Sequence, residues 1–191
     1  MEWQNAMSLP SKTYNCGYCG NALASNFGYR VIDGGGVVGR IYICHYCYSP
    51  TYFGKSGVQH PGAPYGKKVE HIDSEDVVVL YDEAKDCIKA GNPTASVLCS
   101  RKLLMHIAVS KGARNGLSFI EYVEFLAAKG YIPPDGEAWV DHIRTKGNEA
   151  NHEIKIMNRS DAEELINFLE MLLKFIYEFP GKLKVNKSAD K

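Results

Sequence analysis

The residues of this chain with the clearest chemical meaning are four of its six cysteines. They form two Cys-x-x-Cys pairs, Cys16 with Cys19 and Cys44 with Cys47, on either side of residues 20–43. A Cys-x-x-Cys turn can place two sulfurs on one metal ion, and Zn²⁺ takes four ligands in a tetrahedron. The four thiolates therefore predict a structural zinc site with no open coordination position, which argues against catalysis by the metal.

Other roles for the cysteines are open at this point. A redox dithiol is one alternative, although two such pairs that flank one segment fit it poorly. His45 lies inside the second pair and could replace a thiolate, but four cysteines already supply a full set of ligands. Cys87 and Cys99 belong to no such pair, and we interpret them as small buried hydrophobic residues.

A second group of chemically active residues lies in the C-terminal half. Arg144, Asn148 and His152 are spaced i, i+4 and i+8, so on an unbroken helix they fall within roughly 80° of one another. Such a polar stripe could bind phosphate or a nucleotide. Alternatively, Gly147 ends a helix at its C′ position, and Arg144 and His152 then belong to different elements and form no common stripe. His152 would in that case be a structural histidine with its hydrogen bonds satisfied.

The elements that position the cysteines are predicted to be strands. The runs 27–33 and 37–44 are rich in β-branched and aromatic residues, and three glycines join them, so they predict a hairpin between the two cysteine pairs. This is the plan of a zinc ribbon, here residues 1–53, whose small core depends on the metal. Its aromatic residues, with Arg30 and Arg40, could stack on nucleic acid or could simply cover a thin core.

From residue 74 onward the apolar residues follow helical periodicity. Capping boxes at Ser118 and Ser160, each with glutamate three residues later, predict two helix starts, and Pro180-Gly181 predicts the last helix end. The fold class is therefore mainly α, with a small β zinc ribbon followed by a bundle of four to five helices. The predicted organisation is a ribbon at 1–53, a Gly/Pro-rich linker at 54–73, a bundle at 74–180 and a flexible Lys-rich tail at 181–191.

Composition excludes few functions. The chain carries 22 Lys/Arg and 22 Asp/Glu, so its net charge predicts neither nucleic acid nor a membrane surface as a partner. No apolar run is long enough to cross a bilayer, and the N-terminus lacks the pattern of a signal peptide. We therefore expect no membrane association and a cytoplasmic, reducing location, in which cysteines act as metal ligands rather than disulfides.

The helical half also resembles a known family. The run Ala-Ser-Val-Leu-Cys-Ser-Arg-Lys-Leu-Leu (95–104) and the pattern Arg144-x2-Gly147-Asn148-x-Ala150-x-His152 are similar to an uncharacterised prokaryotic domain family that carries an N-terminal zinc ribbon. That family is grouped with the HEPN (higher eukaryotes and prokaryotes nucleotide-binding) helical bundles, and it occurs alone and in restriction and phage-defence proteins. The resemblance implies a HEPN-like bundle, RNA or another nucleic acid or a defence-system protein as partner, and a homodimer.

Many HEPN relatives are metal-independent ribonucleases with an Arg-to-His motif. The resemblance would make His152 the general acid/base, Asn148 a positioning donor, and Arg144 or Arg101 the cation that stabilises the phosphate. Here, however, seven residues separate Arg144 from His152, which is a longer spacing, and Gly147 stands where the relatives place arginine.

Three functional hypotheses follow from this departure. The first, which we favour, is a non-enzymatic module that binds nucleic acid or protein in a defence system. The alternative is a metal-independent HEPN-type endoribonuclease, and a third is an inhibitor that binds a partner. Arg101 also has a structural alternative, an ion pair with Glu83 or Asp86.

Overall fold

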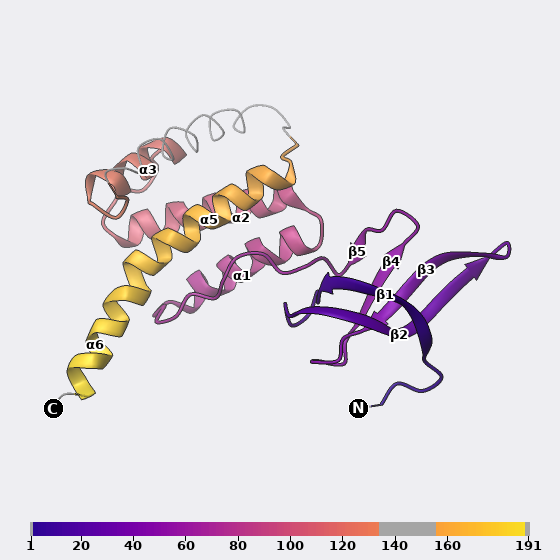
Figure 1. The fold of residues 1–191 in the computed structure, drawn as a ribbon. Helices are drawn as coiled ribbons and strands as arrows, with labels where there is room; N and C mark the ends of the chain where they lie inside the picture. Colours follow the sequence, from indigo (N-terminus) through magenta and orange to yellow (C-terminus); the bar gives the residue numbers. More distant parts are fainter. Residues whose placement is uncertain (1, 134–155, 190–191) are drawn as a thin grey trace. The chain divides into compact units, whose positions relative to one another are not determined.

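The computed structural model describes residues 2–133 and 156–189 (Figure 1). The chain divides into two compact units. One comprises Met1–Tyr65 with Ile88–Gly91, and the other comprises Gly66–Cys87 with Asn92–Lys191. We call them the sheet unit and the helical unit. The domain ranges expected from the sequence remain predictions.

The sheet unit is built on a five-stranded antiparallel sheet in the order β1-β2-β3-β4-β5, so each strand pairs with the next along the chain. The strands are β1 (Met7–Asn15), β2 (Ala22–Asp33), β3 (Gly36–Ile43), β4 (Pro50–Gly54) and β5 (Gln59–His60). The predicted hairpin is confirmed as β2 and β3. Its two turn residues, Gly34 and Gly35, both have positive φ, which is the backbone that a two-residue hairpin turn requires.

The core of the sheet unit is small. Tyr14, Tyr42 and Phe53 meet at ring-centroid distances of 5.3 to 6.2 Å, and two of the contacts are T-shaped. The complete cluster consists of Leu9, Tyr14, Cys16, Leu23, Tyr42, Cys44 and Phe53. Two of its buried members are cysteines of the predicted metal site, so this core and that site are built from the same residues.

The predicted fold class, mainly α, is wrong. Strands account for 22% and helices for 43% of the described chain, and a strand content of about 20–25% is that of an average mixed protein. The unpredicted strands are β1, β4 and β5. β1 was not predicted because it contains Pro10, and proline is rare inside strands. Pro10 lies where the β1–β2 register is irregular, and a residue without an N–H is tolerated at such a position. The short strand β5 lies within the predicted linker.

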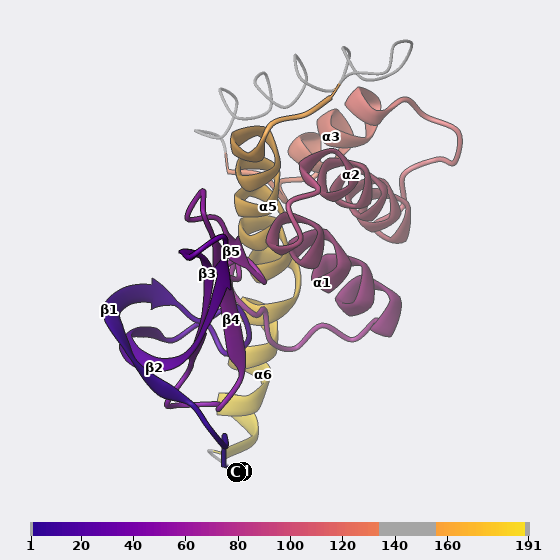
Figure 2. The ribbon, with the colours of Figure 1, turned by 90° about the vertical axis from the view of Figure 1, so that its right-hand side faces the viewer.

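The helical unit contains α1 (Glu75–Lys89), α2 (Pro93–Ser110), α3 (Phe119–Ala128), α5 (Arg159–Leu173), the π-helical turn η2 (Lys174–Glu178) and α6 (Phe179–Ala189). Helix α2 packs against α3 and α5, which lie beside it in Figures 1 and 2. Leu104, Ile107 and Leu169 are fully buried at the centre of this packing. None of the helices in the described ranges combines the length and the apolarity needed to cross a bilayer.

The helix boundaries follow local hydrogen bonding. The capping box predicted at Ser118 is confirmed, but the last capping box is formed by Asn158 and Asp161 instead of starting at Ser160. The predicted helix end at Pro180-Gly181 is wrong, because α6 continues to Ala189. Pro180 is accommodated in the first turn of α6, directly after the π-type bond from the Phe179 N–H to the Lys174 carbonyl, where a missing N–H costs little.

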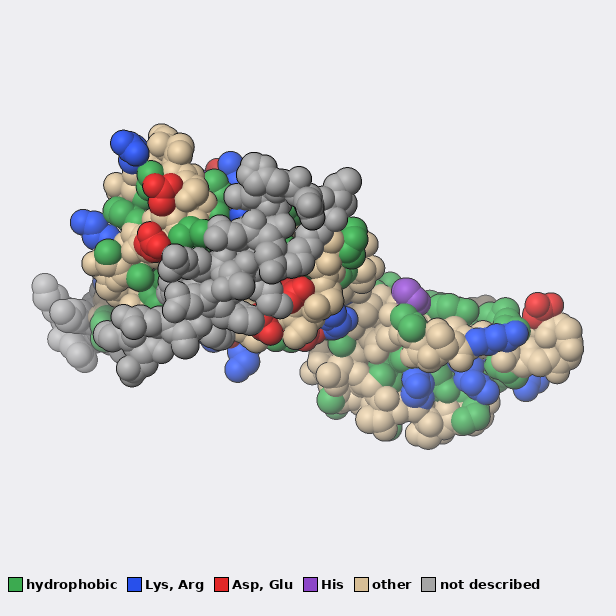
Figure 3. Space-filling model, turned by 90° about the horizontal axis from the view of Figure 1, so that it is seen from above, with side chains coloured by type: hydrophobic (Ala, Val, Ile, Leu, Met, Phe, Trp, Pro, Cys, Tyr) green, Lys and Arg blue, Asp and Glu red, His purple; other side chains and the backbone are tan. Residues whose placement is uncertain are grey.

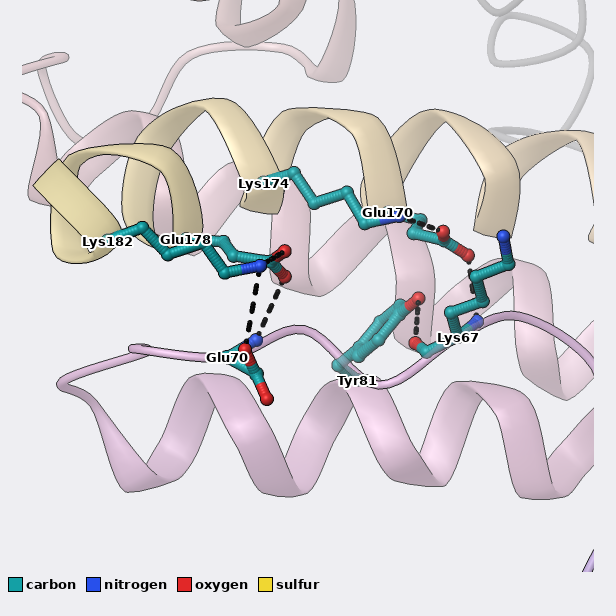
Figure 4. A network of polar contacts seen from close by, with 7 residues as sticks. All are labelled: Lys67, Glu70, Tyr81, Glu170, Lys174, Glu178 and Lys182. Atoms are coloured by element: carbon teal, nitrogen blue, oxygen red, sulfur yellow. Dashed lines mark hydrogen bonds and ion pairs between the residues drawn. The ribbon is translucent and has the colours of Figure 1, made fainter.

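A polar network fixes the segment before α1 to the last helices of the helical unit (Figure 4). The Glu170 carboxylate accepts the Lys67 N–H at 2.8 Å, and the Glu178 carboxylate accepts the Glu70 N–H at 3.1 Å. Glu178 is buried and is also bound by the Lys182 ammonium at 2.7 Å. Residues 67–70 therefore form an ordered part of the helical unit, although they belong to the range predicted as a linker.

Candidate metal centre

The four cysteines lie in two turns of the sheet. Cys16 and Cys19 connect β1 to β2, and Cys44 and Cys47 connect β3 to β4. In an antiparallel meander these alternate connections fall at the same end of the sheet, so the strand order itself brings the two pairs together.

The sulfur positions fit a tetrahedral metal ion. All four Sγ atoms lie within 4.8 Å of one another. The Sγ atoms of Cys16 and Cys47 are 3.6 Å apart, and those of Cys19 and Cys44 are 3.8 Å apart. A tetrahedron with metal–sulfur bonds of about 2.3 Å has edges of about 3.8 Å, which agrees with these two distances. The four thiols could therefore hold one metal ion and are compatible with Zn²⁺.

The two cysteine turns have the same backbone design. The N–H of Gly20 donates to the carbonyl of Cys16 at 2.9 Å, and the N–H of Tyr48 donates to the carbonyl of Cys44 at 2.8 Å. Both donors have left-handed backbone, with φ of 76° at Gly20 and 59° at Tyr48. Glycine adopts this conformation freely, whereas a non-glycine residue there costs of order 1–3 kcal/mol.

Close packing fixes the first turn from outside. A Cβ atom on Gly17 would lie 2.3 Å from the carbonyl oxygen of Pro61 and 2.9 Å from that of Gly62. Two donors also point at sulfur, because the N–H of Tyr18 lies 3.4 Å from the Cys16 Sγ and the side-chain amide of Asn21 lies 3.5 Å from the Cys19 Sγ. Such N–H groups stabilise a metal-bound thiolate and orient it.

Burial and hydrogen bonding give the thiols different pKa values. Burial raises the pKa of Cys16, and burial raises the pKa of Cys44 to about 12. Burial also acts to raise the pKa of Cys47, but hydrogen bonds from the hydroxyl and N–H of Ser49 outweigh it and lower that pKa to about 6. A divalent cation would favour the thiolate form of all four, because its charge is the largest in such a site.

The remaining predicted site residues lie outside the described residues or in the helical unit. Arg144, Asn148 and His152 lie outside the described residues, and so does the helix predicted at 136–143. Arg101 lies on α2 with its guanidinium carbon 4.4 Å from the ring centroid of Phe119, and burial lowers its pKa.

The other cysteines and His45 are accounted for separately. His45 is exposed, and its ring lies next to that of Tyr46, with centroids 4.3 Å apart and the planes tilted by 41°. Cys87 and Cys99 are half-buried in the helical unit, and burial together with the neighbouring Cys87 thiol raises the pKa of Cys99.

One residue next to the centre, Trp3, was not identified from the sequence. Trp3 donates its indole N–H to the carbonyl of Tyr48 at 2.8 Å, which attaches the N-terminal segment to the second turn. Tyr48 itself was visible as an asymmetry, because the first cysteine pair is followed by glycine and the second by tyrosine. No sequence signal indicated the role of Trp3.

Comparison with known proteins addresses the helical part of the chain. Residues 82–189 match the family model described as Domain of unknown function (DUF4145). This range contains α2, α3, α5 and α6 and excludes the four cysteines of the metal centre. No curated protein and no solved structure matches the chain at a significant level. Since the matched range covers more than half of its residues, the chain belongs to the DUF4145 family.

Proposed function

We propose that this protein is a zinc-binding, non-catalytic interaction module whose sheet unit binds the phosphate backbone of nucleic acid. The zinc assignment is supported by the closed set of four thiolates, which leaves no coordination position for a substrate. The partner is proposed from a group of three cations on the sheet, Lys12, Arg30 and Arg40, which we call the cationic face.

The strand register brings the cationic face together. Arg30 on β2 and Arg40 on β3 are direct partners in the antiparallel register, so their side chains share one side of the sheet. Arg40 in turn pairs with Phe53 on β4, and the Lys12 ammonium lies 4.5 Å from the centroid of the Phe53 ring. The three cations therefore come from three strands: Lys12 and Arg40 adjoin Phe53, and Arg30 lies opposite Arg40 on the next strand.

An arrangement of this kind favours an anionic partner. Like charges directly opposite each other on neighbouring strands are destabilising by several tenths of a kcal/mol or more. Among the described residues, no carboxylate forms an ion pair with Lys12, Arg30 or Arg40. Lys and Arg side chains gather on the face of the sheet unit that is seen in Figure 3. A chain of phosphates supplies the missing charge over the length of such a surface.

The test is the salt dependence of binding to a fluorescently labelled single-stranded RNA or DNA, measured by anisotropy. Three phosphate contacts predict a slope of log affinity against log salt of about −2, since each contact on a single strand contributes about −0.7. The double variant Arg30→Gln/Arg40→Gln should reduce the slope to about −0.7. The matched control is Lys68→Gln/Lys102→Gln, which removes the same charge from exposed positions of the helical unit.

Two outcomes would contradict the proposal. One is an unchanged slope in the arginine double variant when zinc content shows that its sheet unit is folded. The other is tighter binding of an acidic peptide than of either nucleic acid, which would identify the partner as a protein.

The alternative activity is a metal-independent HEPN-type endoribonuclease, supported by the Asn148-x3-His152 pattern of the sequence. In that reading His152 is the general acid/base, and Arg144 or Arg101 stabilises the phosphate. The favoured proposal predicts no RNA cleavage in the presence of chelator. Cleavage that the purified chain performs without metal and loses in His152→Ala would establish the ribonuclease instead.

The biological setting is proposed from the family resemblance alone. It comprises a HEPN-like bundle, a prokaryotic phage-defence system and a defence-system protein as a further partner. A reducing cytoplasm is proposed from the residues instead, because four cysteines arranged as metal ligands fit a reducing compartment. Plating efficiency of phages on bacteria that express the chain, compared with bacteria that express the Arg30→Gln/Arg40→Gln variant, tests this setting together with the cationic face.

A further inference from the structure

A hollow of about 300 Å³ lies in the sheet unit beside the second cysteine turn. The N-terminal segment, β2 and the turn that follows β3 form its walls. Its lining includes three aromatic residues, Trp3, Phe27 and Tyr48, together with Glu2 and His45. This volume is at the lower end of the range for ligand pockets, about 300–1,000 Å³, so it suits a small group and not an extended ligand.

Hydrogen bonds and ring packing hold the aromatic wall in place. The indole N–H of Trp3 donates to the carbonyl of Tyr48 at 2.8 Å. The Trp3 ring also packs edge-on against Tyr29 at a centroid distance of 6.1 Å, and the Tyr29 hydroxyl donates to the carbonyl of Gln4 at 2.5 Å. The N-terminal segment is thus fixed to the sheet, and Trp3 is positioned before any ligand arrives, which reduces the entropy cost of binding.

Two aromatic residues of the hollow, Tyr48 and Phe27, are unfavourable for the stability of the fold. Tyr48 occupies the left-handed position that Gly20 occupies in the equivalent turn, with φ of 59°. Tyr48 is 51% exposed, so burial of this residue does little to offset the backbone strain. Phe27 is likewise 43% exposed although it belongs to a β-strand. Strained and exposed aromatic residues around one hollow are better explained by a ligand than by folding.

The charge of the hollow selects the kind of ligand. Among the described residues that line it, Glu2 is the only carboxylate and there is no Lys or Arg. Aromatic faces attract cations through their quadrupole, and a nearby carboxylate adds to this attraction. A lysine ammonium is strongly hydrated, whereas a methylated ammonium spreads its charge over methyl groups that pack on rings. An anionic nucleotide would meet Glu2 without a compensating cation.

We propose that this hollow is an aromatic cage that binds a trimethylammonium group. The group could be carried by a free molecule such as choline or by a trimethylated lysine side chain. The inference does not depend on nucleic-acid binding by the cationic face, because the two sets of residues do not overlap.

The probe for binding is the fluorescence of Trp3. The chain has two tryptophans, so a Trp139→Phe background leaves Trp3 as the only one, and the zinc-loaded full chain is titrated. The ligands are choline, a trimethyllysine peptide, the same peptide unmethylated, and 3,3-dimethylbutanol, the neutral carbon analogue of choline. The cage predicts that a trimethylammonium ligand binds at least about fivefold more tightly than its uncharged or unmethylated counterpart, as about 1 kcal/mol of cation–π attraction gives. A preference for the peptide or for choline identifies the source of the group.

Variants separate the cage from general surface binding. Phe27→Ala and Glu2→Gln should each weaken binding about threefold or more, and Phe175→Ala, which removes a similarly exposed ring from the helical unit, should leave it unchanged. Glu2 is exposed, so its variant tests the charge without a risk to folding. Equal affinity for choline and dimethylbutanol, no effect of either cage variant, no binding at millimolar ligand, or tighter binding of a nucleoside monophosphate would each overturn the proposal.

Discussion

Removal of the metal should unfold the sheet unit and leave the helical unit folded. The structure gives the reason, since two of the seven buried residues in the sheet core, Cys16 and Cys44, are ligands of the proposed zinc site. The apparent binding free energy of a structural zinc ion is about 10–16 kcal/mol. A whole domain is typically stable by only about 5–15 kcal/mol, so loss of the ion is enough to unfold a unit with this small a core.

Hydrogen exchange measured by mass spectrometry resolves the two units in one experiment. After treatment with a chelator, peptides from β1 to β4 should lose their protection, whereas peptides from α2 and α5 should keep theirs. Cys44→Ser should act like the chelator. The matched controls Cys87→Ser and Cys99→Ser remove half-buried thiols outside the site, and both variants should retain one zinc per chain.

One result would refute this reasoning directly. If the metal is shown to be absent and β2 and β3 nevertheless keep their protection, the sheet core is sufficient by itself and the four thiols are not a folding site. If Cys44→Ser binds zinc as tightly as the unaltered chain, the assignment of the ligands is wrong.

The remaining predictions concern packing, acid and assembly. Gly17→Ala should destabilise the zinc-loaded sheet unit by about 2 kcal/mol because its Cβ meets Pro61, whereas Gly36→Ala, with nothing nearer than 3.7 Å, should be nearly neutral in thermal unfolding. Burial acts to raise the pKa of the Glu170 and Glu178 carboxyls, but hydrogen bonds from Lys174 and Lys182 outweigh it, so both pKa values are lowered. The stability that these two carboxylates contribute is therefore present above the unfolded pKa of about 4.3 and is lost as the pH falls through their folded pKa values. Urea unfolding of the helical unit should show this loss, and Glu170→Gln/Glu178→Gln should flatten it. The homodimer that the family resemblance implies would use the exposed rings of η2 and α6, so Phe179→Asp should shift the mass found by light scattering toward the monomer. A wild-type chain that is already monomeric would contradict this prediction.

The clustering of the four cysteines was predictable because the chemistry of a Cys-x-x-Cys turn is local. Each pair supplies two sulfurs through its own backbone turn, and four sulfurs satisfy a tetrahedral ion in whatever sheet carries them. The capping box at Ser118 was predictable for the same reason, since its bonds join residues three apart.

The extent of the sheet was not predictable in this way. β1 and β4 pair with β2 and β3 across the two cysteine turns, and neither shows the pattern of β-branched and aromatic residues that identified the hairpin. The predicted end of the last helix was wrong because proline breaks a helix only when it lies in the interior, where its missing N–H is needed. Pro180 lies instead in the first turn of α6, directly after the π-helical turn.

The sequence by itself determined the four cysteines of the candidate centre, the β2–β3 hairpin and the helical character of the second half, all of which depend on spacing over a few residues. Only the tertiary structure decided that Arg30 faces Arg40, that Lys12 lies over Phe53, and that Trp3 closes a hollow with Tyr48. The last two contacts join residues far apart in the chain, and the first depends on the register of the hairpin. A shift of one position in strand register would move a side chain to the opposite face of the sheet. Register is set by the packing of the whole sheet, so the surfaces to which we assign partners exist only in the folded protein.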